Sequence, residues 1–434
     1  MQHLKPWIKS ISPAKYETVE ERLHHDIVDF IAYVQRTPAE VTVYDTLFRA
    51  LTRFIGQHLR SKTFVSVEQF GSSRTGLGLP GSDLDIVVTT TETEPRSVRK
   101  LPFVLASHLR KSDIVTEVLT NHHAPVPIIK CRSTERLGNI SIDISFKNPL
   151  QGRSSQGILV ASAVQSHLKA QPALAPLVLV LKAFLKQRKL ASAFTGGLGS
   201  YPLIVLVINF LQLNPTGLPR RFITRPFDRD VHSLGRLLID FFVYYSNFPF
   251  ERMYISVNSA QLNTAKMQEN DRIKLASSAL IHPENEAPEP GEIREEVSGE
   301  AIPEPASKSR VGVSWIKNTT LYKAAIQCLV EPETDIGRGT GRMKAVVQEF
   351  KRAATCLLQL QAADEDVLGQ IVGLPEEDIA HRVHIEELVR RGKLSPTERS
   401  RELFSEERTS SKRRRSVEPA NTKKRGRKGD YKTK

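Results

Sequence analysis

The sequence predicts an α+β fold in which a small mixed β-sheet lies between two helical regions. Before residue 61, apolar residues recur at helix spacing, as at Leu23, Ile27 and Val34. Between residues 64 and 146 the pattern changes to short β-rich runs separated by helical stretches. From residue 157 to residue 214 the helical period returns in long apolar stretches. This order favours a mixed-sheet domain flanked by helices.

The most informative segment joins a glycine-serine turn to two aspartates. Gly71 and Ser72 form the turn, and Asp83 and Asp85 stand at the head of the apolar run that follows. Successive side chains of a strand face opposite ways, so the two aspartates project on one face and can hold divalent cations. Gly71 lets the backbone approach a phosphate closely, and Ser72 offers its hydroxyl and its N–H to phosphate oxygens.

A third carboxylate is predicted at Asp143. The two cations of a phosphoryl-transfer site lie about 3.5–4 Å apart and need bridging negative charge. Around Asp143, isoleucines at every second position alternate with polar residues, which predicts a strand with one buried face. A lone glycine-serine turn is usually only a turn, and a lone aspartate pair usually lies in a solvated loop. In this order, with the third aspartate on a later strand, the three features together favour a metal site.

Further motifs follow in the helical region, at residues 177–188, 194–201, 211–215, 234–242 and 335–338. Together with the aspartates they resemble nucleotidyltransferases of the DNA polymerase β superfamily. Within that superfamily the chain is most similar to the nuclear noncanonical poly(A) polymerases of the TRAMP RNA-surveillance complex. The resemblance covers residues 6–358 with one large insertion.

The resemblance implies how the predicted regions are organised. A polymerase β-like nucleotidyltransferase catalytic domain, with a mixed sheet, is expected to be inserted into a helical central domain. The expected segments are an N-terminal part of the central domain, the catalytic domain, the central and poly(A) polymerase-associated domain, and a mostly disordered basic tail. Their expected ranges are 1–60, 61–155, 156–362 and 363–434.

The resemblance also implies which residues contact the nucleotide. Lys182 and Lys186 lie four apart on one predicted helix face, where both can reach one triphosphate. Such a lysine pair otherwise commonly lies on a solvated face. By resemblance, Lys182 binds the triphosphate, Ser200 binds phosphate and Tyr201 stacks on the incoming base. Lys186 matches a second lysine of uridylyltransferase relatives.

Two positions depart from the family pattern. Where relatives carry an Asn-Gly pair that contacts the nucleotide sugar, this chain has Gln156 and Gly157. The loop that selects the base is shorter than in relatives and has Thr334 in place of their Asn or His. Asp335 and Arg338 of the same loop complete the predicted nucleotide-binding set.

The implied function is template-independent addition of AMP to RNA 3′ ends. ATP is the expected substrate, with Mg²⁺ (or Mn²⁺) held by Asp83, Asp85 and Asp143. Polyadenylation of aberrant or non-coding nuclear RNAs would promote their processing and degradation by the exosome. Because the base loop is altered, a terminal uridylyltransferase is an alternative. A catalytically silent scaffold is disfavoured because all three aspartates of the predicted metal site are present. A small-molecule nucleotidyltransferase would account for the glycine-serine turn and the aspartates, but not for the central domain or the basic tail.

Composition agrees with a protein that binds a polyanion. The 434 residues carry a net charge of +14, of which residues 411–434 supply +9. Cys131, Cys328 and Cys356 lie far apart, which indicates reduced thiols and no structural zinc. Charged residues and glycines interrupt the most apolar stretches, so we expect a soluble protein without a membrane span or signal peptide.

Two segments are predicted to be disordered. Residues 283–310 form an acidic insertion, with eight glutamates and five prolines in its first 24 positions. It is either a neutral insertion or a phosphate mimic that regulates RNA access. After an amphipathic helix predicted over residues 377–391, residues 392–434 form the basic tail. The basic clusters at 412–415 and 423–428 favour a bipartite nuclear import signal over a phosphate-binding arm.

The chain shows no separate RNA-binding module. The resemblance therefore implies a zinc-knuckle RNA-binding protein as partner for holding RNA 3′ ends. A DExH-box RNA helicase would complete a TRAMP-like complex that works with the nuclear exosome. The expected location is the nucleus, with the nucleolus as an alternative.

Overall fold

The computed structural model describes residues 3–8, 16–59, 64–90, 95–121, 128–147, 156–228, 232–250, 254–257, 323–332, 334–364 and 366–394. The acidic insertion and the basic clusters lie outside these residues. The predictions made for them therefore stay predictions.

The centre of the first unit is a five-stranded mixed sheet with strand order β2-β3-β6-β5-β4. Only the pair formed by β3 and β6 is parallel, and the other three pairs are antiparallel. The strands are β2 (Phe64–Gln69), β3 (Leu84–Thr90), β4 (Val115–Asn121), β5 (Ile128–Ser133) and β6 (Ser141–Lys147). The mixed sheet predicted from the alternating segments is present.

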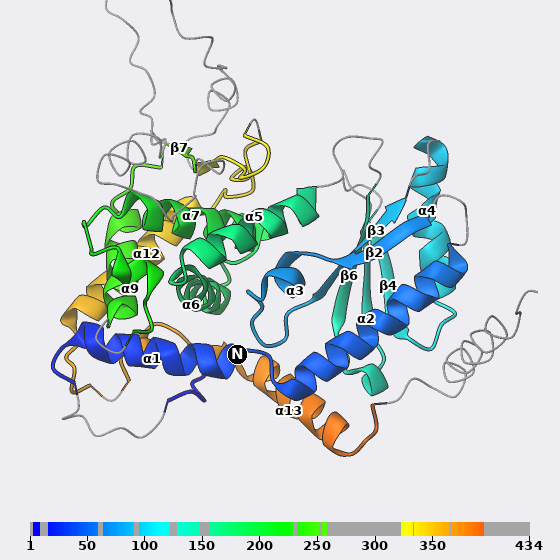
Figure 1. Ribbon diagram of the computed structural model, residues 1–434, viewed down its shortest axis with the longest axis horizontal. Helices are drawn as coiled ribbons and strands as arrows, with labels where there is room; N and C mark the ends of the chain where they lie inside the picture. The colour runs from blue at the N-terminus through cyan, green and yellow to red at the C-terminus, as the bar shows by residue number, and fades with distance from the viewer. Residues whose placement is uncertain are drawn as a thin grey trace, which may run out of the picture.

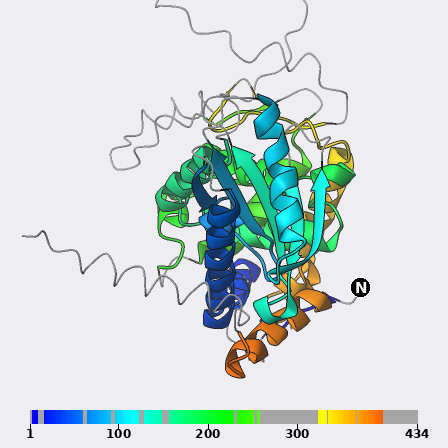
Figure 2. The ribbon, with the colours of Figure 1, turned by 90° about the vertical axis from the view of Figure 1, so that its right-hand side faces the viewer.

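Helices α2 (Pro38–His58) and α4 (Pro95–Leu109) cover one face of this sheet (Figures 1 and 2). Leu84, Ile86, Ile142 and Ile144 of the central strands are fully buried in the core beneath them. Because side chains alternate along a strand, the residues between these apolar positions face the other side of the sheet. The polar residues of β3 and β6 are thereby turned away from the two helices.

The second unit is helical and lies beside the sheet unit (Figure 1). Its apolar core includes Phe184, Phe242 and Phe350. Its main helices are α1 (Val19–Val34), α5 (Gln156–Ala170), α6 (Leu174–Gln187), α7 (Ser200–Leu213), α9 (Ser233–Ser246) and α12 (Met343–Gln359).

The remaining elements, all short except α13, complete the described chain. They are β1 (His3–Leu4), α3 (Gly71–Thr75), η2 (Glu135–Leu137), η4 (Ala193–Thr195), α8 (Arg221–Thr224), β7 (Tyr254–Ile255), β8 (Ala325–Ile326), η6 (Leu368–Gln370), β9 (Leu374–Pro375) and α13 (Glu376–Arg390). No single helix among the described residues is long and apolar enough to cross a membrane, although α5 and α6 would reach that length together across a 119° bend.

The structure divides the chain differently from the predicted segments at two places. Residues 1–60 do not all join the helical unit, because Val43, Leu47 and Leu51 of α2 are buried in the core of the sheet. Their helical period was recognised, but a period alone does not identify the surface against which a helix packs. Residues 366–394, which belong to the segment predicted as a mostly disordered tail, form η6, β9 and α13. The helix predicted over residues 377–391 within that segment is confirmed as α13. Leu368 and Leu374 lie in the helical core, and Ile385 lies in the sheet core.

A buried ion pair holds α13 against the junction of α1 and α2. The Arg382 guanidinium donates to both carboxylate oxygens of Glu40, at 3.1 and 2.9 Å. It also donates to backbone carbonyl oxygens at the end of α1, including that of Gln35 at 3.0 Å. Both side chains are about 5% exposed or less. The last described helix therefore fixes the point where the chain passes from the helical unit to the sheet unit.

Replacing Arg382 by methionine should strongly destabilise the fold. Glu40 would remain buried without a counter-charge, which typically costs about 3–5 kcal/mol in the free energy of unfolding. The measurement is urea-induced unfolding of the full chain. The double variant Arg382→Met, Glu40→Gln should lose clearly less, because no uncompensated charge remains. Arg390→Met, at an exposed position of the same helix, is the matched control, and an equal loss in that variant would contradict this account.

Candidate active site

Three carboxylates meet on the face of the sheet that α2 and α4 leave uncovered. Asp85 of β3 and Asp143 of β6 are direct register partners in the parallel pair. Asp83 lies immediately before β3, two residues from Asp85 and therefore on the same side. The predicted convergence of the three aspartates rests on this register.

The carboxylates repel one another in a partly buried place. Burial, followed by the charges of Asp83 and Asp143, raises the pKa of Asp85 to about 7. Desolvation and then the charge of Asp143 raise the pKa of Asp83. Groups of like charge held this close favour a bound cation, because it removes the repulsion.

A lysine compensates part of this charge. Lys130 of β5 lies opposite Asp143 in the sheet, and its ammonium is 2.9 Å from Oδ2 and 3.3 Å from Oδ1 of that residue. The hydrogen bond to Asp143 raises the pKa of Lys130. A positive charge therefore already sits at the edge of the carboxylate cluster.

The glycine-serine turn forms the short helix α3 and packs directly on Asp85. Gly71 has a φ of +56°, and a Cβ at this position would lie 2.5 Å from Oδ2 of Asp85. Only glycine fits there without displacing the carboxylate. The backbone N–H of Phe70 donates to the carbonyl oxygen of Asp85 at 3.1 Å, and the N–H of Ser72 donates to its carboxylate. The turn is thus held at a fixed distance from the acidic strand.

A cavity of about 420 Å³ opens between this turn and helices α6 and α7. It brings together seven of the predicted site residues: Gly71, Ser72, Asp83, Asp85, Lys182, Lys186 and Ser200. Asp143 does not line the cavity itself, but it adjoins Asp85 across the strand pair. Phosphates and cations can therefore be bound on one continuous surface.

The two lysines of α6 already have partners. Lys182 donates to the carbonyl oxygen of Leu77, and burial lowers the pKa of Lys182 to about 8. The Lys186 ammonium lies 2.5 Å from Oδ2 of Asp378, which α13 contributes. Both ammoniums line the cavity, as the four-residue spacing predicts, but only Lys186 is bound to an acidic side chain.

The predicted base-binding residues form a second group next to the cavity. The hydroxyl of Tyr201, the neighbour of Ser200, accepts a hydrogen bond from the N–H of Leu329 at 3.0 Å. Thr334 donates its hydroxyl to Glu331 at 3.2 Å. Asp335 is buried and accepts backbone N–H groups of Ile326 and Gly337. Asp335 therefore shapes the loop from inside, whereas Arg338 is exposed.

Gln156 and Gly157 begin α5, beside the glycine-serine turn. A Cβ on Gly157 would lie 3.0 Å from the ring of Phe70, the residue that precedes Gly71. Farther along α5, the amide of Gln165 donates to the carbonyl oxygen of Arg74 at 2.9 Å. The start of α5 therefore adjoins the predicted phosphate-binding turn, although Gly157 does not line the cavity.

Three residues of the site were missed by the sequence analysis. Ser73 lies 3.4 Å from both the carbonyl oxygen of Asp83 and the backbone N of Asp85. The alternation of residues 128–133 could have marked Lys130 as a strand residue, but not its place beside Asp143. Asp378 was missed because its helix was assigned to the tail.

The donor set fits hard divalent cations. All three predicted ligands are carboxylates, and oxygen is the ligand that Mg²⁺ and Mn²⁺ prefer. Burial and mutual repulsion raise the pKa of both Asp83 and Asp85, and an ammonium contacts Asp143, so a bound cation would relieve the excess negative charge of this surface. The site can hold cations and phosphates side by side, which is the requirement for phosphoryl transfer.

Sequence comparison finds the same relationship in two separate segments. Residues 23–160 match the family model for the central palm domain of mitochondrial-like poly(A) RNA polymerase, and residues 233–283 match that of the Cid1 family poly A polymerase. The poly(A) RNA polymerase cid14 of Schizosaccharomyces pombe is 36% identical over 255 residues, which are 58% of this chain and 34% of the relative. Poly(A) RNA polymerase protein 2 of Saccharomyces cerevisiae is 36% identical over 247 residues, 57% of this chain and 39% of the relative. The chain thus spans well under two thirds of these relatives' lengths.

Solved structures agree with the sequence relationship. The polymerase core of TRAMP, an RNA surveillance complex, superposes with a TM-score of 0.62 at 27% identity, covering 85% of this chain and 98% of that chain. A cytoplasmic RNA terminal U-transferase shares the fold, with a TM-score of 0.53 at 20% identity, covering 82% of this chain and 100% of that chain. The predicted polymerase β-like mixed-sheet fold with a helical central domain is confirmed.

Asp85→Asn should stabilise the cation-free protein at alkaline pH. The folded pKa of about 7 exceeds the ordinary value of about 4, so between these values the folded chain keeps a proton that the unfolded chain releases. The free energy of unfolding of the natural chain therefore falls as pH rises through this window. At pH 8 with EDTA, the variant should be roughly 2–4 kcal/mol more stable, and at pH 4 the difference should vanish.

The measurement is urea-induced unfolding at both pH values, repeated at pH 8 with Mg²⁺. Mg²⁺ should stabilise the natural chain more than the variant. Asp113→Asn, which alters an exposed aspartate of the same unit, should change neither result. If Asp85→Asn were no more stable than Asp113→Asn at pH 8, the repulsion described above would be absent.

Proposed function

Because the chain belongs to the noncanonical poly(A) polymerase family, we propose that it extends RNA 3′ ends with AMP from ATP, without a template. In this reaction the RNA 3′ oxygen bonds to the α-phosphorus of ATP, and the bond from that phosphorus to pyrophosphate breaks. Product RNA is one nucleotide longer, and pyrophosphate leaves.

One observation carries the proposal: a cavity that presents carboxylates on one side and a phosphate-binding turn and two lysines on the others. The carboxylates suit cations, whereas the lysines suit the charge of a triphosphate. A site for a neutral small molecule would need neither the cluster of carboxylates nor the pair of lysines. This arrangement therefore supports binding of a nucleoside triphosphate with its metal ions.

The chain's own residues supply binding, orientation and charge. Asp83, Asp85 and Asp143 would hold Mg²⁺ or Mn²⁺, which when bound would make the 3′-hydroxyl more acidic and neutralise charge on the α-phosphate. Gly71 leaves room for the Asp85 carboxylate against the backbone of the turn. Ser72, which lines the cavity, would offer its hydroxyl to a phosphate. Lys182 stabilises the departing pyrophosphate by charge.

For Lys186 to bind a triphosphate, its contact with Asp378 must be broken or shared. Its ammonium is paired with Asp378, so a phosphate oxygen would have to replace or share that carboxylate. The exchange replaces one anion by another, so the charge of Lys186 stays compensated throughout. Arg338 and Thr334, on the base loop, would act on the base end of the nucleotide.

Uridylyl transfer is the second candidate. Thr334 stands where relatives carry Asn or His, and its hydroxyl is engaged by Glu331. A threonine whose hydroxyl hydrogen is donated to a carboxylate has only the oxygen left, as an acceptor for the base. An asparagine amide or a histidine ring can instead also offer an N–H donor. The nucleotide that is incorporated decides between the two.

We also propose the setting in which the enzyme acts. RNA 3′ ends are its substrates, and a zinc-knuckle RNA-binding protein and a DExH-box RNA helicase are its partners in a TRAMP-like complex. Polyadenylated aberrant and non-coding RNAs would pass to the nuclear exosome. A nuclear location is proposed from the two basic clusters; deletion of residues 411–434 with unchanged nuclear accumulation would contradict it.

The test is incubation of the purified full chain with labelled RNA, Mg²⁺ and each nucleoside triphosphate in turn. The zinc-knuckle partner is present in a parallel series. We expect extension with ATP in preference to the other nucleotides. Preferred use of UTP would favour uridylyl transfer, and no extension with any nucleotide in either series would contradict the proposal.

Asp143→Asn tests the role of the third carboxylate. Loss of a metal ligand should lower the rate of extension at least about a hundredfold, because even changes to groups that only orient metal ligands cost 10–100-fold. Asp113→Asn is the matched control and should extend RNA at the natural rate. Equal rates in the two variants would remove Asp143 from the mechanism.

A further inference from the structure

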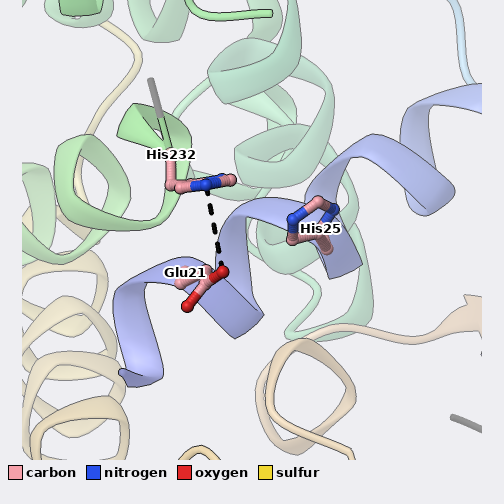
Figure 3. A group of neighbouring side chains, drawn as sticks. All are labelled: Glu21, His25 and His232. Atoms are coloured by element: carbon pink, nitrogen blue, oxygen red, sulfur yellow. Dashed lines mark ion pairs between the residues drawn. The ribbon is translucent and has the colours of Figure 1, made fainter. Parts of the chain in front are cut away.

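A second group of metal-binding side chains lies in the helical unit, apart from the active cavity. Glu21 and His25 project from α1, and His232 comes from the residue just before α9 (Figure 3). None of the three lines the active cavity. All three side chains are half-buried.

The spacing of the three side chains suits a single ion. Glu21 and His25 are four residues apart and so lie on one face of α1. One ligand atom from each of the three residues lies within 4.8 Å of the other two. A tetrahedral zinc ion with bonds of about 2.0–2.2 Å holds its ligands roughly 3.3 Å apart. Small side-chain rotations would therefore bring all three atoms to ligand distance.

The contacts inside the group are incomplete without an ion. Nε2 of His232 lies 3.9 Å from Oε1 of Glu21, which is too long for a hydrogen bond. Nδ1 of His232 is buried and has no hydrogen-bond partner among the described residues. Buried nitrogens of this kind normally have a partner.

The backbone around the group is held in place. The N–H of Leu234 donates to Nδ1 of His24 at 3.2 Å, which ties the start of α9 to α1. A Cβ on Gly235 would lie 2.1 Å from the carbonyl oxygen of Glu20, so the two backbones are in direct contact there. The start of α9, which directly follows His232, is therefore held against the part of α1 that carries Glu21 and His25.

We propose that Glu21, His25 and His232 bind one Zn²⁺ ion that ties α1 to α9. Two imidazole nitrogens and one carboxylate oxygen are a ligand set that zinc accepts, with water as the fourth ligand. Mg²⁺ and Ca²⁺ prefer oxygen ligands throughout. The spacing of the cysteines predicts no structural zinc, whereas this site uses no cysteine. The ion fastens the helix that leads to the Arg382 junction, so its role is structural.

The test measures Zn²⁺ binding to the metal-stripped full chain by competition with a chromogenic chelator. Excess Mg²⁺ is present, to keep the carboxylates of the active site occupied. The natural chain should bind one equivalent, and His25→Gln and His232→Gln should each weaken binding by about tenfold or more. Zn²⁺ should raise the Tm of the natural chain and not that of His232→Gln.

Co²⁺ provides a readout that reports the ligands directly. Four-coordinate Co²⁺ with nitrogen ligands should give an intense visible absorption in the natural chain, and His232→Gln should lose it. His58→Gln is the matched control, because His58 is an exposed histidine whose ring lies 4.6 Å from that of His108, centroid to centroid. Absence of stoichiometric binding, or retention of binding in both cluster variants, would overturn the proposal. Loss of binding in His58→Gln alone would place the ion at that pair and would also overturn it.

Discussion

The parallel pairing of β3 with β6 is the constraint on which the site depends. Its register sets Asp85 beside Asp143, and a slip of one residue would turn every side chain of one strand to the opposite face. Leu84 and Ile142, which are fully buried under α2 and α4, oppose such a slip. The apolar face of the sheet thus fixes the position of the charges on its other face.

The charges of the site come from separate parts of the chain. Lys130 reaches the carboxylates from β5, Lys182 and Lys186 reach the cavity from the helical unit, and Asp378 comes from α13. Holding like charges together costs free energy in the cation-free protein, which is common where function requires a local arrangement that folding alone would avoid. Binding of cations and phosphates relieves this cost, so the ligands contribute to the stability of the region that binds them.

Site residues could be predicted from sequence where the local periodicity of a strand or a helix determines which side chains lie on the same face. Asp83, Asp85 and Asp143 follow from strand alternation, and Lys182 and Lys186 follow from helix spacing. The pairing of Lys130 with Asp143 was not predictable in this way, because alternation does not tell which strands are neighbours. The same limit applies to α2, whose period is clear but whose packing partner is not. The amphipathic pattern predicts the helix α13, but a charged residue on such a helix normally faces solvent, and only the tertiary contacts reveal that Arg382 and Asp378 are buried.

The Arg382–Glu40 contact joins residues 342 positions apart, which has a consequence for biosynthesis. A ribosome adds roughly 5–20 residues per second, so Glu40 emerges tens of seconds before its counter-charge. The pairing of β1 with β9 is delayed in the same way, since His3 pairs with Pro375. The nascent polypeptide therefore carries Glu40 without its counter-charge, and β1 without its partner strand, during most of translation.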